Sequence, residues 1–379
     1  MEKVFKYELF NKMIRDFAVN EVKPLAHEVD EQERFPYETV EKMAKLGLMG
    51  IIVPKEYGGM GGDYKMYIKA VEELSKVCAT TGVILSAHTS LCIAPIMEYG
   101  NEEQKKKYLP KLASGEWLGA FGLTEPNAGT DANNQTTTAV KEGDHWVLNG
   151  SKIFITNAGP ANVYFVIAVT GRNPKGVECA AFIVEKGFPG FSVGKKELKM
   201  GIRGSSTCEL IFENCIVPEA NLVGKIGEGV KMALKTLDGG RVGISAQALG
   251  IAEGALEATV AYVKERKQFN KPISAFQNTQ FCLADLYTKI NAASLLVERA
   301  TEAKQNKSPM LGMYAAQAKL FAAETAMEVT TKCVQLHGGY GYTREYPVER
   351  MMRDAKITEI YEGTSEVQRM VISGALLKK

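Results

Sequence analysis

The amino-acid sequence predicts an α+β protein, mostly α, in which a β domain stands between two helical domains. Apolar residues recur at helical spacing up to residue 119 and again after residue 222. Between these points the helical period is lost, and short apolar runs separated by glycines replace it. The 379 residues suffice for two or three domains. We therefore expect an N-terminal α-helical domain at 1–119, a middle β-barrel or sandwich domain at 120–222 and a C-terminal four-helix bundle at 223–379.

The N-terminal domain reads as a series of amphipathic helices. The first helix is expected to bury a stripe that recurs in four-residue steps, made of Phe5, Leu9, Met13 and Phe17. Further helices are expected at Glu38–Leu46, which ends before the helix-stopping Gly47, at Lys65–Lys76, and after an N-cap at Asn101. The glycine-rich stretch at 58–62 lacks the third glycine of a dinucleotide-binding fingerprint and reads as a loop.

The middle domain carries strand signals. Trp146–Leu148 and Lys152–Thr156 flank Asn149-Gly150, a dipeptide typical of tight turns, so these residues predict a hairpin. Other short apolar strands are expected at Val163–Val169, Ala180–Val184 and Cys208–Phe212.

The C-terminal domain is rich in alanine and strongly helical in its pattern. Long helices are expected at Val230–Leu237, Ala246–Arg266, Phe281–Gln305 and Met310–Leu336. The breaks near 269–272, 306–309 and 338–341 are short, which favours an antiparallel bundle. Ligand sites in such chains tend to lie where domains meet.

Composition and charge argue against several classes of protein. Hydrophobic residues make up 45% of the chain, and the net charge of +2 disfavours nucleic acid and anionic membranes as partners. Neither a secretory signal nor a run of about 18 apolar residues is visible. The seven cysteines form no C-x-x-C pair and the four histidines lack metal-ligand spacing. We therefore expect no metal site, no disulfide framework and a reducing cytoplasm.

Three segments carry side chains suited to binding, although each also has a purely structural interpretation. The loop 123–131 offers hydroxyl and backbone N–H groups to a flat heterocycle or a phosphate, or is simply a tight turn. Arg266 and Phe269 follow a long helix and offer a cation and a ring, or only a favourable charge at a helix C-terminus. Gln335–Gly339 ends another helix in a glycine turn, which by itself is a plain C-cap.

Glu362 is the candidate catalytic residue. It lies between Tyr361 and Gly363, where a carboxylate held at a bend can act as a general base and a glycine lets a substrate approach the backbone. The alternative is a helix start with Thr364 as the N-cap. The segment 360–366 by itself leaves both interpretations open.

In combination, these segments make the chain similar to the acyl-CoA dehydrogenase family nearly from end to end. Among members of that family, the chain most resembles the short-chain, butyryl-CoA type of anaerobic bacteria. The motifs that carry the resemblance agree in order and spacing: Leu-Thr-Glu-Pro-Asn-Ala-Gly-Thr-Asp at 123–131, Asn-Gly-Ser-Lys-Ile-Phe-Ile-Thr-Asn at 149–157, Leu-Asp-Gly-Gly-Arg at 237–241, Glu-Arg-Lys-Gln-Phe at 265–269, Gln-Leu-His-Gly-Gly-Tyr-Gly-Tyr at 335–342 and Arg-Asp-Ala-Lys-Ile-Thr-Glu-Ile-Tyr-Glu-Gly-Thr at 353–364.

The resemblance implies a helical, β and four-helix-bundle domain order, and FAD bound between the β domain and the bundle of a homotetramer. Part of the FAD site would come from a neighbouring subunit. Positions that match FAD contacts of the family are Phe121, Leu123, Thr124, Thr130, Phe154, Ile155, Thr156, Arg266, Phe269, Gln277, Gln335, Leu336, His337, Gly338, Gly339, Thr364 and Glu366. Positions that match the surroundings of the acyl-CoA are Thr130, Asp238, Arg241, Tyr361 and Gly363.

The resemblance also implies a reaction. Glu362 matches the base that removes the α-proton of an acyl-CoA while the β-hydride passes to the flavin, giving a trans-2-enoyl-CoA. Some relatives carry the base at the position of Gly240, so Glu362 is the one candidate here. Electron-transfer flavoprotein is the expected redox partner.

A four-carbon substrate is favoured. Residues 77–97 contain no Arg or Lys that would bind a dicarboxyl substrate of the glutaryl type, and 85–92 resembles short-chain members. The reaction runs from butyryl-CoA to crotonyl-CoA or in reverse, a direction that depends on the partner. The alternatives are a related acryloyl-CoA or enoyl-CoA reductase and a non-catalytic subunit that binds a CoA thioester or a flavin. An acyl-CoA oxidase is disfavoured by chain length.

Overall fold

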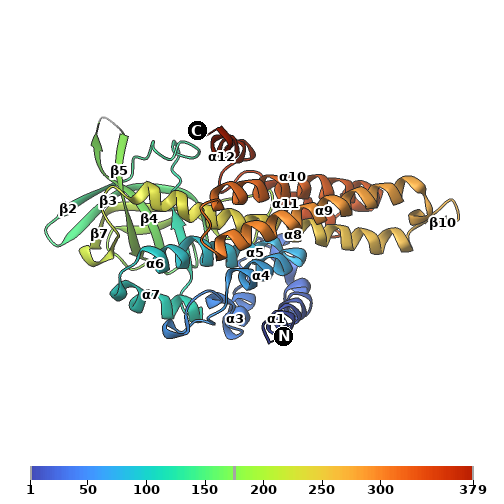
Figure 1. Ribbon diagram of the computed structural model, residues 1–379, viewed down its shortest axis with the longest axis horizontal. Coiled ribbons are helices and arrows are strands. Elements are labelled where there is room, and N and C mark those ends of the chain that lie inside the picture. Colours follow the sequence, from blue (N-terminus) through green and yellow to red (C-terminus); the bar gives the residue numbers. More distant parts are fainter. Residues whose placement is uncertain (1, 174–175, 378–379) are drawn as a thin grey trace.

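The computed structural model of the protein describes residues 2–173 and 176–377. Figure 1 shows an elongated molecule with the sheet at one end and long helices that extend to the other. The N-terminal helices, in blue, lie along one side of these long helices. The family-like order of a helical, a β and a second helical region is therefore present in the structure.

The N-terminal region is helical throughout, with short loops between its elements. Its elements are α1 (Glu2–Phe17), η1 (Ala18–Val22), η2 (Lys23–Leu25), α2 (Ala26–Glu31), α3 (Tyr37–Lys45), η3 (Leu48–Gly50), η4 (Lys55–Tyr57), α4 (Tyr64–Val77), α5 (Ala79–Ser86), η5 (Ala87–Ile93), α6 (Ala94–Tyr99) and α7 (Glu102–Ser114). The cap expected at Asn101 is confirmed, because its side chain accepts a hydrogen bond from the Gln104 N–H at 2.8 Å. Gly47 follows α3 with a left-handed φ of 74°, as a helix-ending residue should.

The stripe expected on α1 is wrong in part. Leu9 is 60% exposed, whereas Phe10, Ile14 and Phe17 are buried. A helix advances about 100° per residue, so strict four-residue steps drift by about 40° each and leave the buried face. The spacing of three and four residues keeps the buried side chains on one face. The side chain of Phe5 lies outside the described residues.

A long apolar stretch lies inside this region. Residues Ala79–Tyr99 are long enough and, by mean hydropathy, apolar enough to cross a membrane, but 94% of that window is buried within the structure. Its threonines, serines and His88 interrupt any purely apolar run, and this is why the sequence pattern did not reveal it. The stretch is a core helix of the protein.

The β domain contains one mixed sheet. Its strands are β1 (Gly119–Gly122), β2 (Thr138–Glu142), β3 (His145–Thr156), β4 (Val163–Asn173), β5 (Gly176–Glu185), β6 (Phe191–Lys196), β7 (Thr207–Pro218) and β8 (Leu222–Val223), in the order β6-β7-β3-β2-β4-β5-β8 with β1 beside β4. Trp146 from β3, Tyr164 from β4, Phe182 from β5 and Phe212 from β7 share one buried cluster. The curved sheet therefore encloses a core of its own.

The hairpin expected at Asn149-Gly150 is wrong. Both residues lie within the continuous strand β3, which shifts register against β7 between Leu148 and Gly150. A Cβ on Gly150 would lie 2.7 Å from the Thr137 Cα, so the glycine permits a close backbone approach rather than a turn. The real hairpin joins β2 to β3 through Gly143 and Asp144, where Gly143 has a left-handed φ of 63°.

The C-terminal region contains three long helices and two shorter ones. They are α8 (Gly229–Glu265), α9 (Gln277–Gln305), α10 (Leu311–His337), α11 (Val348–Thr358) and α12 (Ser365–Leu377), with the small hairpin β9 (Lys267–Gln268) and β10 (Lys271–Pro272), η7 (Ile273–Ala275) and η8 (Gly338–Tyr342) between them. The helices expected at Val230–Leu237 and Ala246–Arg266 form one helix, α8. The chain stays helical between them because the glycines there pack closely against neighbouring elements. A Cβ on Gly243 would lie 2.6 Å from the Ser86 Oγ and 2.8 Å from the Tyr67 Oη.

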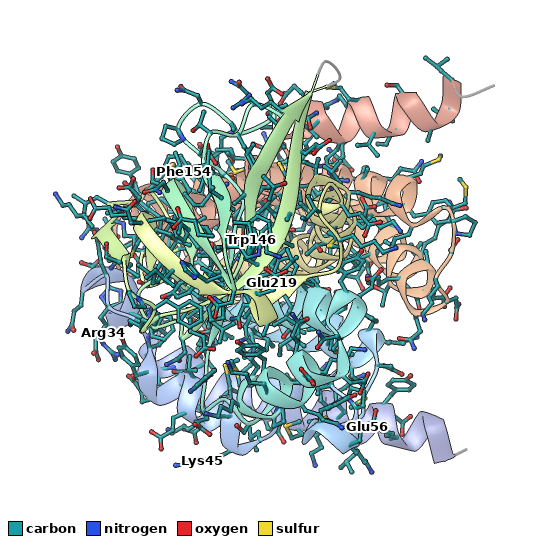
Figure 2. All side chains as sticks on the ribbon, turned by 90° about the vertical axis from the view of Figure 1, so that its left-hand side faces the viewer. Arg34, Lys45, Glu56, Trp146, Phe154 and Glu219 are labelled. Carbon is teal, nitrogen blue, oxygen red and sulfur yellow. The ribbon has the colours of Figure 1, made fainter. Side chains whose placement is uncertain are left out.

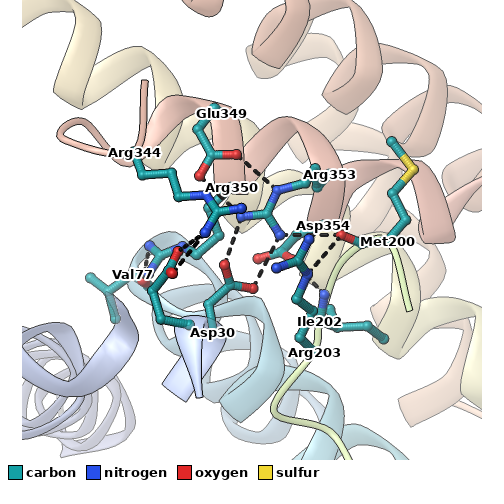
Figure 3. Close-up of polar contacts among 11 residues, drawn as sticks. Asp30, Val77, Met200, Ile202, Arg203, Arg344, Glu349, Arg350, Arg353 and Asp354 are labelled. Carbon is teal, nitrogen blue, oxygen red and sulfur yellow. Dashed lines mark hydrogen bonds and ion pairs between the residues drawn. The ribbon is translucent and has the colours of Figure 1, made fainter. Parts of the chain in front are cut away.

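Helix α11 is fixed to both other regions by buried polar contacts (Figure 3). Arg353 forms ion pairs with Asp30 of α2 at 2.6 Å and with Glu349 at 2.8 Å. Asp354 accepts a hydrogen bond from the Ile202 N–H of the β domain at 2.5 Å. Because α11 carries the chain directly into the segment that contains Glu362, these contacts set the position of that segment.

We predict that Arg353→Met lowers the free energy of unfolding by about 3–5 kcal/mol, because it leaves the Asp30 carboxylate buried without its cation. The matched control is Arg344→Met, which removes a 2.8 Å ion pair between exposed Arg344 and Glu31 and should cost less than about 1 kcal/mol. Urea unfolding followed by tryptophan fluorescence measures both. Equal losses in the two variants would contradict a special role for the α11 contacts.

Candidate active site

Glu362 lies in the turn between α11 and α12, defined here as the Glu362 turn, residues 359–364. Glu362 and Gly363 both have left-handed backbone, with φ of 54° and 95°. A non-glycine residue in that region costs about 1–2 kcal/mol and persists only where its surroundings hold it. The strain therefore marks Glu362 as a residue that the fold holds in a fixed orientation.

Donors from three helices hold the carbonyl groups of this turn. Arg241 of α8 donates from Nε to the Glu362 O at 3.3 Å, and Lys319 of α10 donates from Nζ to the Gly363 O at 2.7 Å. Gln368 of α12 donates to both carbonyls, at 3.3 and 2.7 Å. The sequence analysis did not identify Lys319 or Gln368, since both act through contacts distant in the chain or through a neighbouring helix face.

The side chain of Glu362 points into a space that α8 leaves open. A Cβ on Gly240 would lie 2.0 Å from the Glu362 Oε2 and 2.9 Å from the Leu91 Cδ2. The carboxyl therefore occupies the volume that a side chain at position 240 would fill. A base at position 240 and a base at position 362 would therefore occupy the same space, so one chain can carry only one of them in this arrangement.

The pKa of the Glu362 carboxyl lies near neutral pH. Its Oε2 is buried and has no hydrogen-bond partner in the described part of the chain. Burial raises the pKa of Glu362 to about 7, although the charges of Lys319 and Arg241 act in the opposite direction. A carboxylate with a pKa near the working pH is suited to general base catalysis.

Of the residues expected near the acyl-CoA, Tyr361 and Gly363 flank Glu362 in the chain, and Arg241 contacts its main-chain carbonyl. Asp238 forms a 2.8 Å ion pair with Arg241, and burial raises the pKa of Asp238 despite that cation. The hydroxyl of Tyr361 donates to the Gln247 Oε1, and burial raises the Tyr361 pKa well above its usual value. Thr364 precedes α12, and its Oγ1 accepts a 3.4 Å hydrogen bond from the Val367 N–H. The helix start and the positioned carboxylate are therefore both present.

The residues expected at one end of the FAD, called here the proximal set, lie on the β domain: Phe121, Leu123, Thr124, Thr130, Phe154, Ile155 and Thr156. The Ile153 N–H donates to the Thr124 O at 2.8 Å, which joins the two segments of the set. Phe154 lies in a bulge of β3, with a left-handed φ of 59° and a side chain that is 61% exposed. Figure 2, which faces this end of the molecule, labels Phe154 on the β domain.

A buried ion pair that the sequence analysis missed stiffens the proximal set. Lys152 donates to the Glu125 Oε1 at 2.6 Å, to the Gln135 Oε1 at 2.8 Å and to the Leu123 O at 3.1 Å. Although burial opposes it, the nearby Lys152 ammonium lowers the pKa of Glu125 to about 2, while burial lowers that of Lys152 to about 8. The pair is therefore ionised at neutral pH. Glu125 lies in a loop and Lys152 in strand β3, and neither segment carries a local sequence signal that the two side chains meet.

The other expected FAD residues, called here the distal set, lie away from the Glu362 turn: Arg266, Phe269, Gln277, Gln335, Leu336, His337, Gly338 and Gly339. Arg266 precedes the β9–β10 hairpin and Phe269 lies in its turn, and Figure 1 shows this hairpin at the far end of the bundle from the sheet. The His337 O accepts from the Tyr262 hydroxyl at 3.1 Å, near the same end of α8. Glu366 is exposed at the start of α12. One chain does not bring the two sets together.

Both sets have features that suit FAD. Phe269, like Phe154, has a left-handed φ, of 51°, and an exposed ring, at 88%. Strained backbone that presents an exposed aromatic ring is typical of a binding surface. The proximal set adds threonine hydroxyls for a polar heterocycle, and the distal set adds the Arg266 cation for a nucleotide phosphate. The residues present therefore fit the cofactor.

Comparisons with known proteins agree with this geometry. Models of the acyl-CoA dehydrogenase N-terminal, middle and C-terminal domains match residues 6–116, 120–215 and 227–377. A short-chain specific acyl-CoA dehydrogenase of Clostridium acetobutylicum is 62% identical over 98% of each chain. The chain belongs to the acyl-CoA dehydrogenase family, a family of enzymes that carry FAD.

Two solved structures are also very similar. Butyryl-CoA dehydrogenase from Megasphaera elsdenii superposes with a TM-score of 0.95 at 51% identity, covering 98% of both chains. A chain from work on the electron transferring flavoprotein of Acidaminococcus fermentans and flavin-based electron bifurcation has a TM-score of 0.95 at 55% identity, again covering 98% of both chains. The fold expected from the sequence is thereby confirmed.

We predict that Gly240→Ala lowers the turnover of acyl-CoA thioesters by about 100-fold, because the new Cβ displaces the Glu362 carboxyl by an ångström or more. The matched control is Gly239→Ala, whose Cβ would meet only the flexible end of Lys304 at 3.3 Å. Both variants gain helix propensity. A dye-coupled assay at saturating substrate measures the effect, and equal activity of the two variants would contradict the steric argument.

Proposed function

We propose that the protein dehydrogenates a short-chain acyl-CoA, butyryl-CoA to crotonyl-CoA, with Glu362 as the base that removes the α-proton. The observation that carries this proposal is the buried Glu362 Oε2, which has no hydrogen-bond partner among the described residues and lies in the space beside Gly240. An α-proton next to a thioester is weakly acidic, so its removal needs a base of raised pKa held in one orientation. The strained turn and the burial of the carboxyl supply both.

The protein would orient the thioester through groups around the same turn. The carbonyl groups of Glu362 and Gly363 are already engaged by side chains of the bundle. We infer that the Glu362 N–H donates to the thioester oxygen, where charge develops as the proton leaves. Asp238, Arg241, Tyr361, Gly363 and Thr130 are proposed to line the acyl-CoA site. A bound acyl chain would exclude water from the carboxyl.

FAD, when bound, supplies the acceptor for the β-hydride. We propose that the proximal set, with Thr364 and Glu366, holds the flavin end of the cofactor. The distal set is proposed to hold the FAD of a neighbouring subunit, because the two sets lie at different ends of one chain. Such shared sites require an oligomer, and we propose a homotetramer on the resemblance to the family. We also propose domain boundaries after residues 119 and 222 and a cytoplasmic location.

We propose electron-transfer flavoprotein as the redox partner, consistent with the similar chain from the Acidaminococcus work. A four-carbon substrate is favoured by the similarity to butyryl-CoA dehydrogenase and by the absence of Arg and Lys from residues 77–97. The reaction direction depends on the potential of the partner.

The deciding experiment is an anaerobic visible spectrum of the purified protein before and after addition of acyl-CoA thioesters from three to eight carbons. Bleaching of a yellow protein, fastest with butyryl-CoA, is the expected result. A strong preference for the three-carbon pair would instead favour an acryloyl-CoA reductase. A yellow protein that no thioester bleaches would indicate a subunit that only binds the flavin.

We predict that Glu362→Gln keeps FAD and loses dehydrogenation, because the amide fills the same space but cannot accept the α-proton. The loss in turnover should be at least about 1,000-fold, the scale expected for removal of a catalytic base. Flavin absorbance per protein checks the cofactor, and the dye-coupled assay checks turnover. Near-wild-type turnover in this variant would sink the assignment of Glu362.

We predict that kcat/KM of the wild-type protein rises with pH through about pH 7, because only the ionised Glu362 carboxylate can accept the proton. Below that pKa, kcat/KM should fall about tenfold per pH unit. The measurement is kcat/KM for butyryl-CoA from pH 5 to 9. A flat profile across pH 6–8 would mean that the titration of Glu362 does not limit the reaction.

A further inference from the structure

Lys319 is a fully buried lysine on α10. Its Nζ donates to the Gly363 O at 2.7 Å, and no described carboxylate oxygen lies within ion-pairing distance of it. On the same helix its neighbours at the buried face are small, among them Ala315, Ala322 and Ala323. A buried ammonium without a counter-ion is strongly unfavourable, so a lysine at this position needs an explanation that packing does not supply.

Charged groups from several elements act on Lys319 and Glu362. The charged groups that act on Lys319 are Glu362, Arg241, Glu359 and Glu366. Glu362 is acted on by Lys319 from α10 and Arg241 from α8, and it faces the phenols of Tyr361 and Tyr67. Arg241 is already paired with Asp238. Lys319 is therefore the cation near Glu362 that has no carboxylate partner of its own.

We propose that Lys319 is a positioning residue for the reaction: it holds the strained Glu362 turn through the Gly363 carbonyl, and its charge favours the ionised form of Glu362. This proposal rests on the proposed function of Glu362 as the base. Lys319 and Gln368 both donate to the Gly363 carbonyl, and Arg241 and Gln368 donate to the adjacent Glu362 carbonyl. With these donors in place, the two left-handed residues cannot relax without breaking a hydrogen bond to a buried cation.

The charge of Lys319 is present only over part of the pH range. Burial lowers the pKa of Lys319 to about 8, although the Glu362 charge opposes this. The ammonium is therefore largely protonated at pH 7, where Glu362 titrates, and is neutral well above pH 8. Removal of the cation disfavours the carboxylate, so it must raise the pKa of Glu362.

The kinetic test uses the FAD-loaded protein and three variants. Lys319→Met removes the charge and the donor, Lys319→Gln keeps an amide donor without the charge, and Lys332→Met removes an exposed charge from the same helix. For Lys319→Met we expect kcat/KM at pH 7 to fall by at least about tenfold, from the loss of a charged hydrogen bond. The rising limb of its pH profile should move to higher pH.

The two Lys319 variants separate the two parts of the role. Lys319→Gln should show the same displaced limb but recover activity at high pH, because the amide can still hold the Gly363 carbonyl. Lys332→Met should follow the wild type within about twofold, as expected for an exposed charge. If both Lys319 variants lose only thermal stability and keep the wild-type pH profile, Lys319 is merely structural and the proposal is overturned. Should Lys319→Met not fold, Lys319→Gln alone decides the pH effect.

A second measurement needs no turnover. The folded-state pKa of Glu362 exceeds its ordinary value of 4.5, so ionisation costs the folded protein stability as pH rises from about 4.5 to about 7. The Tm of Glu362→Gln minus that of wild type should therefore increase over this range. In the Lys319→Met background the increase should continue to higher pH. An increase that is identical in the two backgrounds means no coupling and overturns the proposal.

The two measurements distinguish the two proposals. Suppose that the Tm effect of Glu362→Gln depends on Lys319 but that the protein turns over no acyl-CoA. The proposed function would then be refuted, while the link between Lys319 and Glu362 would stand. Turnover that depends on Glu362, with no coupling to Lys319, would support the proposed function and refute the role of Lys319.

Discussion

A buried carboxyl oxygen with no hydrogen-bond partner among the described residues is the constraint on which the rest of the structure depends. The Glu362 Oε2 lies in the space beside Gly240, and burial raises the pKa of the carboxyl to about 7. Burying an unpaired carboxyl oxygen costs free energy, and the strained backbone that carries it persists only where its surroundings hold it. The turn is accordingly held by α8, α10 and α12, and α11 is clamped to α2 and to the β domain before it enters the turn.

Helix α8 shows how local preference gives way to this requirement. Glycine costs about 1 kcal/mol in a helix interior relative to alanine, yet α8 continues through all its glycines. A Cβ on Gly250 would lie 2.2 Å from the Glu72 O, and one on Gly254 would lie 2.0 Å from the Lys76 O. The glycines thus let α4 approach closely, and at Gly240 they make room for the carboxyl. Packing against α4 over a long buried face outweighs the intrinsic cost.

The distribution of the cofactor residues points to assembly. Phe154 and Phe269 are both exposed on strained backbone, but they lie on the β domain and at the remote tip of the bundle. In the proposed arrangement, FAD shared between subunits would cover both rings. Under the proposed FAD contacts, a complete site requires an oligomer, because the proximal and distal sets lie at different ends of one chain.

The sequence by itself determined the three-part organisation, the caps at Gly47 and Asn101, and Glu362 with its candidate role, because these depend on local pattern and on motifs. It predicted a stripe through Leu9, a turn at Asn149-Gly150 and a break in α8 that the structure corrects. It did not reveal Lys152 with Glu125 or Lys319 with Gly363, which are separated by 27 and 44 residues. Periodicity shows that a segment has a buried face, whereas only the tertiary structure decides which distant group meets that face. For a buried charge, the partner that it meets decides whether its burial stabilises or destabilises the fold.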